Sequence, residues 1–408
     1  MLHGLLKRMI RVGDLQVRLP NGRVDTYGDG TGPRVEVRLT SRAVRAIAAD
    51  PTVGVGESYM NGDLEFEAGD IWTLLELGGR NNAPSGRRSL AGRLLNFARR
   101  RIDQWNDRNA SRRNVHHHYD LSYDLYRRFL DRDMQYSCAY WPSLDITLEE
   151  AQAAKKAHIT AKLKLEPGMK VLDIGCGWGG LALELGARYG VEVLGVTLSE
   201  EQLAIAQRRA EEAGLQDRVR FSLTDFRDVR GPFDRIVSVG MFEHVGAPNH
   251  LEFFRDVHRL LTDDGIALIH SIGRSTPPSV TNAFIRKYIF PGGYIPALSE
   301  TMAAVEEAGL WATDIEILRL HYAETLKQWR LRFWAQREEI VRLYDERFCR
   351  MWGYYLASSE YGFRYGDNMN FQLQLTKRVG AAPMTRDYML DDERLGPVAA
   401  RRQIQAAE

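Results

Sequence analysis

The feature that most constrains this chain is an apolar run that ends on an acid and leads directly into a glycine-rich turn. Residues 171–180 read Val-Leu-Asp-Ile-Gly-Cys-Gly-Trp-Gly-Gly. The apolar part predicts a buried strand over 170–174, and the residues that follow predict a helix over 178–189. Glycines at 175, 177 and 179 let the backbone approach a flat ligand closely, because no side chain stands in the way. We therefore expect a nucleoside-binding turn between a strand and a helix.

Two classes of nucleoside cofactor fit this turn. Gly175, Gly177 and Gly180 satisfy G-x-G-x-x-G, the dinucleotide fingerprint, which also expects an acid at the end of the next strand. Here that strand, 191–196, is followed by Thr197. The leading Asp173 and the missing second acid favour S-adenosylmethionine (SAM), with NAD or a purely structural glycine turn as the alternatives.

The residues around the turn alternate between strand and helix patterns. The predicted elements are 170–174, 178–189, 191–196, 200–213, 219–223, 234–239, 248–261 and 266–271. Such alternation predicts an α/β fold with a parallel sheet that is covered by helices on both faces. The later segment 281–360 is predicted to be helical and rich in aromatics. Residues 371–375 are predicted to form a last, antiparallel strand at the sheet edge, and residues after 381 a loose tail.

Residues 1–85 predict a separate small α+β domain. Residues 15–19 and 35–39 alternate between apolar and polar side chains, as half-buried strands do. Asn21-Gly22 is a tight-turn signal, and Thr40 or Ser41 can cap a helix that runs to Ala49. With a basic linker at 86–115, a catalytic domain at 116–380 and a tail at 381–408, the chain is predicted to have four parts.

Composition limits the classes of protein. The chain has 408 residues and a net charge of +1, and no apolar stretch approaches the roughly eighteen residues of a membrane span. The apolar part of residues 1–10 is too short for a signal peptide. Three cysteines without metal-ligand spacing favour a reducing cytoplasm. Residues 116–118 are three histidines, but adjacent side chains point in different directions, so we expect no metal site.

The segment 87–113 concentrates positive charge. It holds nine arginines and two aspartates, a net charge of +7, with apolar residues at near-helical spacing. A basic amphipathic helix is typical of binding to a membrane surface, and a solvated linker helix is an equal alternative. Nucleic-acid binding is disfavoured because no recognition motif accompanies the arginines.

Further motifs carry a resemblance to a known family. They occupy residues 118–121, 134–141, 233–246, 270–273, 287–293 and 351–356. Together they resemble the cyclopropane-fatty-acyl-phospholipid synthases, relatives of the mycolic-acid cyclopropane synthases, in one colinear match from about Gly56 to Lys377. The first domain is similar to the phospholipid synthases in particular, because the mycolic-acid enzymes lack it. The resemblance implies that this domain binds lipid.

The resemblance implies a Rossmann-like SAM-methyltransferase fold with a seven-stranded sheet and helices on both faces, a SAM site and a bicarbonate site. The positions that match SAM contacts are Gly175 and Gly177 at the methionine and ribose, Thr197 and Gln202 at the ribose, Tyr136 and Ser137 at the methionine end, Asp225 and Phe226 at the adenine, and Gly240 in the cleft. Asp173 joins them from the loop. The residues that match contacts of a bound bicarbonate ion are Cys138, Glu243, His270, Tyr322 and the backbone of Ile272, and the four side chains are the implied catalytic residues.

The implied chemistry suits such a set. A cis double bond is a poor nucleophile and must attack the methyl group at close range in a dry site. The attack leaves a positive charge on the acyl chain, and ring closure then removes a proton from the added methyl group. A small anion held by Glu243 and His270 can stabilise that charge and accept the proton.

Each of these residues also has a purely structural interpretation. Cys138 and His270 are types that often fill a core, and Glu243 could cap a helix. Trp329, Phe333 and Trp334 have the spacing of core packing, and lining of an acyl tunnel is the alternative. Many relatives carry a cysteine where this chain has Ser359, and the mechanism above gives that position no role.

The resemblance therefore implies a cytoplasmic enzyme, peripheral at the inner membrane surface. It is expected to add a methylene group from SAM across cis double bonds of phospholipid acyl chains, in a bilayer that is anionic, as a homodimer. Two alternatives stay open. A sibling enzyme would stop at methyl-branched, methylene or furan-precursor lipids, and an inactive methyltransferase fold would only bind lipid.

Overall fold

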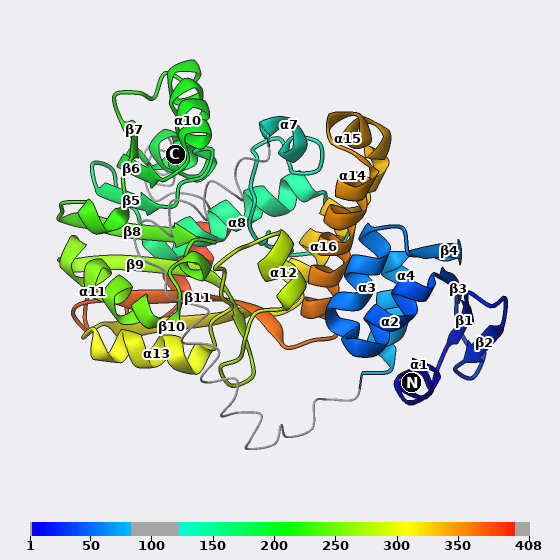
Figure 1. Ribbon diagram of the computed structural model, residues 1–408. Coiled ribbons are helices and arrows are strands. Elements are labelled where there is room, and N and C mark those ends of the chain that lie inside the picture. Colours follow the sequence, from blue (N-terminus) through cyan, green and yellow to red (C-terminus); the bar gives the residue numbers. More distant parts are fainter. Residues whose placement is uncertain (1, 83–121, 396–408) are drawn as a thin grey trace. The chain divides into compact units, whose positions relative to one another are not determined.

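The computed structural model describes residues 2–82 and 122–395 of the chain. They form two compact units, labelled by element in Figure 1. Unit 1 contains residues 2–82, 280–291 and 322–368, and unit 2 contains residues 122–279, 292–321 and 369–395. The basic segment 87–113 and the histidines at 116–118 lie outside the described residues, so the predictions made for them stay predictions.

Unit 1 contains a four-stranded sheet in the order β2-β1-β3-β4. Its strands and the helices around it are β1 (Asp14–Arg18), β2 (Val24–Tyr27), β3 (Arg34–Leu39), β4 (Leu64–Ala68), α1 (Leu2–Met9), α2 (Ser41–Ala49), α3 (Pro51–Met60) and α4 (Ile71–Arg80). The predicted turn is confirmed, because Gly22 has φ +82° and its amide donates to Leu19. Thr40 caps α2 by accepting a hydrogen bond from the amide of Ala43, as predicted.

The aromatic helices of the later segment belong to the same unit. They are α12 (Ala283–Tyr288), α14 (His321–Ala335), α15 (Arg337–Leu343) and α16 (Glu346–Arg364). Helix α16 packs on α3 and α4. The contact is close at Gly56, where a Cβ would lie within 3 Å of Tyr354 and Phe284. These helices complete the core of unit 1, and the predicted limits at residues 85, 115 and 380 stay predictions.

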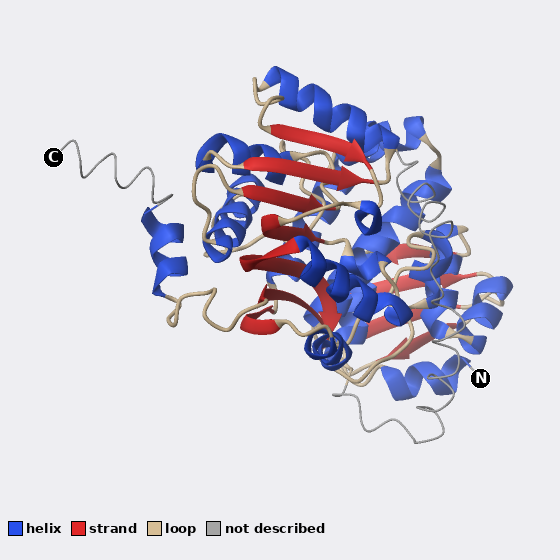
Figure 2. Cartoon of the chain, turned by 90° about the vertical axis from the view of Figure 1, so that its left-hand side faces the viewer, coloured by secondary structure: helices blue, strands red, loops and turns tan. Residues whose placement is uncertain are grey.

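Unit 2 contains a seven-stranded sheet in the order β10-β11-β9-β8-β5-β6-β7. The strands are β5 (Lys170–Ile174), β6 (Glu192–Thr197), β7 (Val219–Leu223), β8 (Phe233–Val239), β9 (Leu261–Arg274), β10 (Trp311–Leu318) and β11 (Asn368–Thr376). Strands β5 to β9 pair in parallel, and β10 and β11 are antiparallel. Figure 2 shows these strands in red with helices packed beside them. The predicted α/β fold is confirmed.

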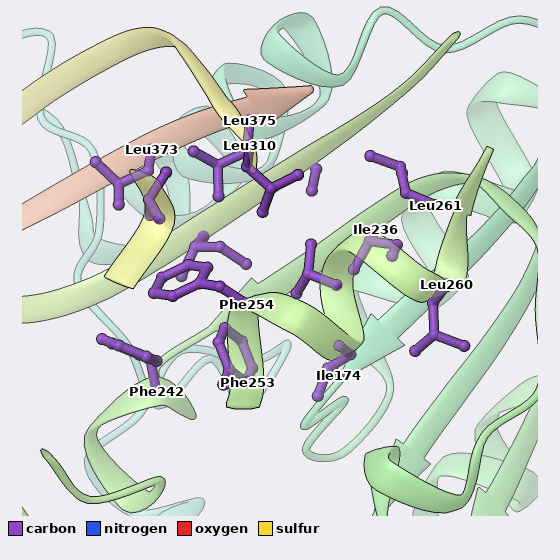
Figure 3. Packing of buried hydrophobic residues seen from close by; sticks show 14 of the residues in the cluster. Ile174, Ile236, Phe242, Phe253, Phe254, Leu260, Leu261, Leu310, Leu373 and Leu375 are labelled. Carbon is purple, nitrogen blue, oxygen red and sulfur yellow. The ribbon is translucent and has the colours of Figure 1, made fainter. Parts of the chain in front are cut away.

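The two faces of this sheet carry separate hydrophobic cores. The helices of unit 2 include α7 (Tyr123–Tyr126), α8 (Leu148–Leu163), α9 (Gly180–Tyr189), α10 (Glu200–Glu212), α11 (His250–Leu260) and α13 (Leu298–Glu307). Figure 3 shows one core, in which Phe253 and Phe254 of α11 meet Ile236 and Leu373 from the strands. Helices α8, α9 and α10 supply the other core. Side chains of β5, β8 and β9 alternate between the two cores, as the two-residue period requires.

Two sequence predictions about the end of the sheet are wrong. Residues 311–318 form strand β10 within the segment predicted to be helical, and β10, not β11, is the edge. Strand β11 has an alternating sequence (Asn-Phe-Gln-Leu-Gln-Leu), a pattern that is typical of a half-exposed strand. In the structure both of its faces are buried, because Gln372 and Gln374 hydrogen-bond to residues of α8. Hydrogen bonds of these two amides within the protein therefore replace the hydrogen bonds that an exposed face would make to water.

The prediction of a loose tail after residue 381 is also wrong for part of it. Residues 387–395 form helix α17 (Asp387–Leu395), which contacts α8. The Tyr388 hydroxyl accepts a 2.6 Å hydrogen bond from Gln374, and the Glu393 carboxylate lies 3.2 Å from His158 Nδ1. The helix is polar in sequence, and hydrogen bonds to buried groups hold it in place.

Tyr388→Phe tests this attachment. The variant removes one acceptor for the buried Gln374 amide, so we expect a loss of about 1 kcal/mol in the free energy of unfolding, measured by urea denaturation. Thr385→Ala, at an exposed residue just before the helix, is the control and is expected to change stability little. Equal stability of both variants and the wild type would show that α17 is not held by this bond.

Candidate active site

The glycine turn connects β5 to α9 and leaves its backbone open at one residue. The amides of Gly175 and Cys176 both donate to the Val196 carbonyl, at 3.0 and 3.1 Å. A Cβ at Gly175 would lie 2.8 Å from Met241, and one at Gly179 would lie 2.7 Å from Phe221. At Gly177, which has φ +54°, a Cβ would meet nothing within 4 Å. Gly175 and Gly179 are thus required by packing, and the space at Gly177 is available to a ligand.

Asp173 lies just before this turn with an unsatisfied carboxylate oxygen. The side chain is buried, and its Oδ2 has no hydrogen-bond partner among the described residues. Burial raises the pKa of Asp173 to about 7, although the Lys155 charge opposes the shift. A buried acceptor without a donor is costly unless a ligand satisfies it. The hydroxyl and ammonium groups of SAM are suitable donors, so this residue fits the cofactor.

The predicted ribose residues meet at the carboxyl end of β6. Thr197 Oγ1 donates to Gln202 Oε1 at 3.0 Å and accepts from the amide of Ser199 at 3.2 Å. Ser199 in turn caps α10 by accepting from the amide of Gln202, which confirms the predicted helix start. No acid stands at this strand end, which agrees with the preference for SAM over NAD.

The predicted adenine residues follow β7. Asp225 caps the short helix η1 (Phe226–Asp228), and its two oxygens accept from the Arg227 guanidinium at 2.8 and 2.6 Å. Phe226 packs edge-on against Phe253 of α11, with ring centroids 5.4 Å apart. Both residues therefore have structural contacts of their own, and their contact with adenine stays a prediction.

The segment 131–138 lies against the glycine turn. Arg209 donates to the Trp178 carbonyl at 2.7 Å and also pairs with Asp133. A Cβ at Gly180 would lie 2.4 Å from Gln135, so only glycine fits the start of α9. Tyr136 packs on Tyr126, which packs on Trp178, with both centroid distances 5.0 Å. The structure thus brings Tyr136 and Ser137 to the predicted cofactor loop.

Lys155 is a site residue that the sequence did not reveal. It is buried in α8, and its Nζ donates to Gln135 Oε1 at 2.5 Å and to Ser137 Oγ at 2.9 Å. Burial lowers the pKa of Lys155 to about 8. Its charge opposes the burial that raises the pKa values of Cys138 and Asp173, and it adds to the burial that lowers the pKa of His270. In the sequence it is half of a Lys-Lys pair, which is typical of an exposed helix face.

Cys138 is a neutral thiol in this setting. It is 1% exposed, and its Sγ donates to the carbonyl of Ala139 at 3.3 Å. Burial raises the pKa of the thiol well above its ordinary value. Because the thiolate is the nucleophilic form, Cys138 is suited to contact a ligand and not to attack it.

Glu243 joins strands β8 and β9 at their carboxyl ends. It lies in the short helix η2 (Phe242–His244), and its Oε1 accepts a 2.6 Å hydrogen bond from the amide of Ile272. Its Oε2 is buried without a hydrogen-bond partner in the described part of the chain. Burial raises the pKa of Glu243 to about 7, and the Ile272 amide partly offsets this. Nearby, the Gly240 amide donates to the His270 carbonyl at 2.9 Å.

The structure places the remaining predicted residues as follows. His270 is buried in β9, and its ring nitrogens lie 3.1 Å from Gln372 Nε2 and 3.2 Å from Asn370 Nδ2. Burial, helped by the charges of Lys155 and Lys162, lowers the pKa of His270 to about 3, so the ring is neutral. Tyr322 is buried in unit 1, with its ring 4.8 Å from that of Phe363. Its position relative to His270 stays a prediction.

Comparison with known proteins decides the family. A model described as mycolic acid cyclopropane synthetase matches residues 106–373, more than half of the chain. The chain belongs to this family. It is an enzyme of the SAM-dependent methyltransferase class, and a second model, of a domain of unknown function, matches residues 1–87.

Individual members of the family agree with this. The cyclopropane-fatty-acyl-phospholipid synthase of Escherichia coli (strain K12) is 41% identical over 337 residues, 82% of this chain and 86% of that protein. The tuberculostearic acid methyltransferase UfaA1 of Mycobacterium tuberculosis is 36% identical over 382 residues, 89% and 87% of the two chains. The mycolic acid cyclopropane synthase CmaA1, solved with SAH and CTAB, is 36% identical with a TM-score of 0.62, over 65% of this chain and 97% of that chain.

Within residues 2–82 and 122–395, no helix has both the length and the apolar character needed to cross a bilayer. The same residues contain no cluster of three or more histidine, cysteine or acidic side chains that could hold a metal ion.

Gly177→Ala tests the cofactor loop. A Cβ at this position meets no protein atom but enters the open space, so we expect SAM affinity to fall about tenfold or more, which corresponds to 1.4 kcal/mol. Isothermal titration calorimetry measures this. The positive φ adds about 1–2 kcal/mol of backbone strain, which thermal denaturation reports separately.

Gly214→Ala is the matched control, because Gly214 has φ +65° and equally empty surroundings in the turn after α10. It is expected to lose similar stability and to keep wild-type SAM affinity. Equal SAM affinity in both variants would contradict the assignment of the loop.

Glu243→Gln tests the buried acid. The carboxyl titrates near 4.5 when unfolded and at about 7 when folded, so the folded state binds the extra proton between these values. Stability from this group is therefore present below pH 4.5 and is lost as pH rises to 7, by about 3 kcal/mol. Thermal melting should show a flatter decline between pH 5 and 7 for Glu243→Gln than for the wild type. The exposed control Glu252→Gln should follow the wild type, and parallel curves for all three proteins would show that Glu243 is ionised throughout.

Proposed function

We propose that this protein transfers a methyl group from SAM to a cis double bond of an unsaturated phospholipid acyl chain and closes a cyclopropane ring. The observation that carries the proposal is the buried pair of unsatisfied carboxylate oxygens, on Asp173 beside the glycine turn and on Glu243 at the ends of β8 and β9. The likeness to the phospholipid synthase over 82% of the chain supports the substrate. One acid suits the cofactor, and the other suits the reacting centre.

The residues at the first site are suited to hold and orient SAM. Bound SAM supplies an electrophilic methyl group. The open backbone at Gly177 and the paired side chains of Thr197 and Gln202 can accept its ribose. The Asp173 carboxylate can accept hydrogen bonds from its polar groups. Lys155 fixes Ser137 and Gln135, so this wall of the site is preorganised before the ligand binds.

The second site is suited to a reaction that water would spoil. Attack by the double bond leaves a positive charge on the acyl chain, and water would convert it to an alcohol. Cys138, Glu243 and His270 are each 9% exposed or less, so the groups around the reacting centre are held away from solvent. The neutral thiol of Cys138 is a far weaker nucleophile toward the cation than a thiolate would be.

We further propose that Glu243, His270 and Cys138 bind bicarbonate, with Tyr322 and the Ile272 backbone as predicted partners. Bound bicarbonate supplies a base for the proton that leaves the added methyl group. A Glu243 carboxyl with a pKa near 7 can be protonated and donate from Oε2 to that anion. The Ile272 amide already donates to Glu243 Oε1. The proposed contact of this amide with the anion would therefore be shared with Glu243 or taken over by Glu243.

A second candidate function is favoured by the likeness to the tuberculostearic acid methyltransferase over 89% of the chain. The same residues would then yield methyl-branched or methylene-bearing chains, because proton loss from a different carbon avoids ring closure. In either case we propose that a homodimer acts from the surface of an anionic bilayer. The basic segment 87–113 and residues 1–85 are its proposed membrane contacts.

Expression in a bacterial host that lacks cyclopropane lipids tests the function. We expect mass spectrometry to show phospholipid acyl chains heavier by one methylene group that resist mild hydrogenation. An alkene or methylene product would take up two hydrogens and would establish the second candidate. Unchanged lipids in a host that contains folded protein would refute both, and Gly177→Ala serves as the cofactor-deficient control.

Bicarbonate dependence is the sharper prediction. Purified enzyme in carbonate-free buffer should lose most of its activity on unsaturated vesicles and regain it when bicarbonate is added. In Glu243→Gln the regained activity should be at least about tenfold lower, since a hydrogen bond to a charged group contributes roughly 1.5–3 kcal/mol. The SAM affinity of this variant, measured by calorimetry, should stay close to that of the wild type. Activity that ignores bicarbonate in both proteins would remove the anion from the mechanism.

A further inference from the structure

A buried row of amides lies on the face of β11 that is turned toward α8. Asn370, Gln372 and Gln374 are each 1% exposed or less. The apolar residues between them join the core on the opposite face. Asn370 and Gln372 lie against the two ring nitrogens of His270, and Gln372 also meets Lys162 of α8. The row therefore connects the candidate active site to a buried charged group.

The charged group fixes the orientation of Gln372. Lys162 Nζ pairs with the Glu316 carboxylate and donates to Gln372 Oε1 at 2.7 Å. Burial alone would raise the pKa of Glu316, but His158 and Lys162 outweigh it and lower the pKa to about 2, so Glu316 is ionised. An ammonium group donates and never accepts. Gln372 must therefore present its carbonyl oxygen to Lys162.

The orientation of Gln372 in turn fixes the proton on His270. With its oxygen turned to Lys162, the amide directs Nε2 at His270 Nδ1, 3.1 Å away. An amide nitrogen can only donate, so Nδ1 must accept. A neutral imidazole has one acceptor and one N–H, and His270 is neutral. The ring proton is therefore on Nε2.

Asn370 fits the same tautomer once its side-chain amide is turned. Its Nδ2 lies 3.2 Å from His270 Nε2, which would place two donors face to face, while its Oδ1 is buried without a partner in the described residues. Turning the side-chain amide by half a turn lets the Nε2 proton bond to Oδ1. This change pairs Oδ1 with the ring proton, and side-chain amides are assigned from such networks.

We propose that Lys162 and Gln372 are positioning residues that lock His270 as the Nε2–H tautomer, so that it donates a hydrogen bond at the active site and does not act as a base. With Nδ1 occupied by Gln372 and Nε2 already protonated, His270 has no position for the proton released on ring closure. That proton must leave by another acceptor. Asn370 Oδ1 is the acceptor of the Nε2 hydrogen in the network described above, and only its replacement by bicarbonate rests on the proposed function.

Nitrogen-15 NMR of the full-length protein with labelled histidine tests the tautomer directly, without SAM or lipid. His270→Gln identifies the His270 signals by subtraction. In the wild type we expect the His270 Nδ1 resonance in the unprotonated range and Nε2 in the protonated range, unchanged from pH 6 to 8. A wild-type spectrum with Nδ1 protonated would overturn the inference.

The variant Gln372→Glu provides a second test of the tautomer. A carboxylate accepts from Lys162 and also accepts from Nδ1, so the proton should move to Nδ1 or a second proton should bind. Gln374→Met removes a buried amide two residues along the same face and should leave the His270 signals in place. Circular dichroism checks that both variants fold. An unchanged His270 spectrum in folded Gln372→Glu would also overturn the proposal.

Kinetics separate this inference from the proposed function. If both hold, Gln372→Glu should raise the bicarbonate concentration needed for half-maximal activity about tenfold, the value of one hydrogen bond of 1.4 kcal/mol, with SAM affinity unchanged. If the spectra are as expected but the enzyme makes no cyclopropane, the locked tautomer is supported and only the proposed function is contradicted.

Discussion

The burial of charged side chains on helix α8 is the constraint on which the candidate site depends. Lys155 holds the segment with Ser137, Lys156 pairs with Asp133, and Lys162 reaches Glu316 and Gln372. Leaving one such charge buried without a partner costs several kcal/mol. The helix can therefore occupy this face of the sheet only if strands β10 and β11 and the segment 131–138 provide partners in the right places. Their positions fix both the cofactor loop and the reacting centre.

The same pairing sets the protonation states at the two sites. His270 is neutral because it is buried near two ammonium groups, and Cys138 is a thiol because burial outweighs the Lys155 charge. Burial raises the pKa values of Asp173 and Glu243 to about 7, which also favours their neutral forms. A site with weak nucleophiles and exchangeable protons is consistent with chemistry that passes through a carbocation, which strong nucleophiles would trap.

The polar network also explains how a family can share one fold and differ in product. The proposed SAM residues lie at the ends of β5, β6 and β7, and the proposed bicarbonate residues lie at the ends of β8 and β9. Ligands of open α/β sheets bind at such carboxyl ends. A change in which acceptor receives the proton would alter the product without disturbing the binding of SAM. Relatives named as synthases and as methyltransferases match this chain over similar lengths.

The sequence by itself determined the parallel sheet, the glycine turn and the choice between cofactors, because strand and helix periods and the Thr197 position are local signals. It also determined the first domain's turn at Gly22 and the caps at Thr40 and Ser199. Only the tertiary structure decided that β11 is internal, that the Lys155 ammonium is buried and that α17 is docked. Polar residues look exposed in a sequence, since nothing local shows that a distant chain supplies their hydrogen bonds. The tautomer of His270 has the same origin, because it depends on Lys162, more than a hundred residues away along the chain.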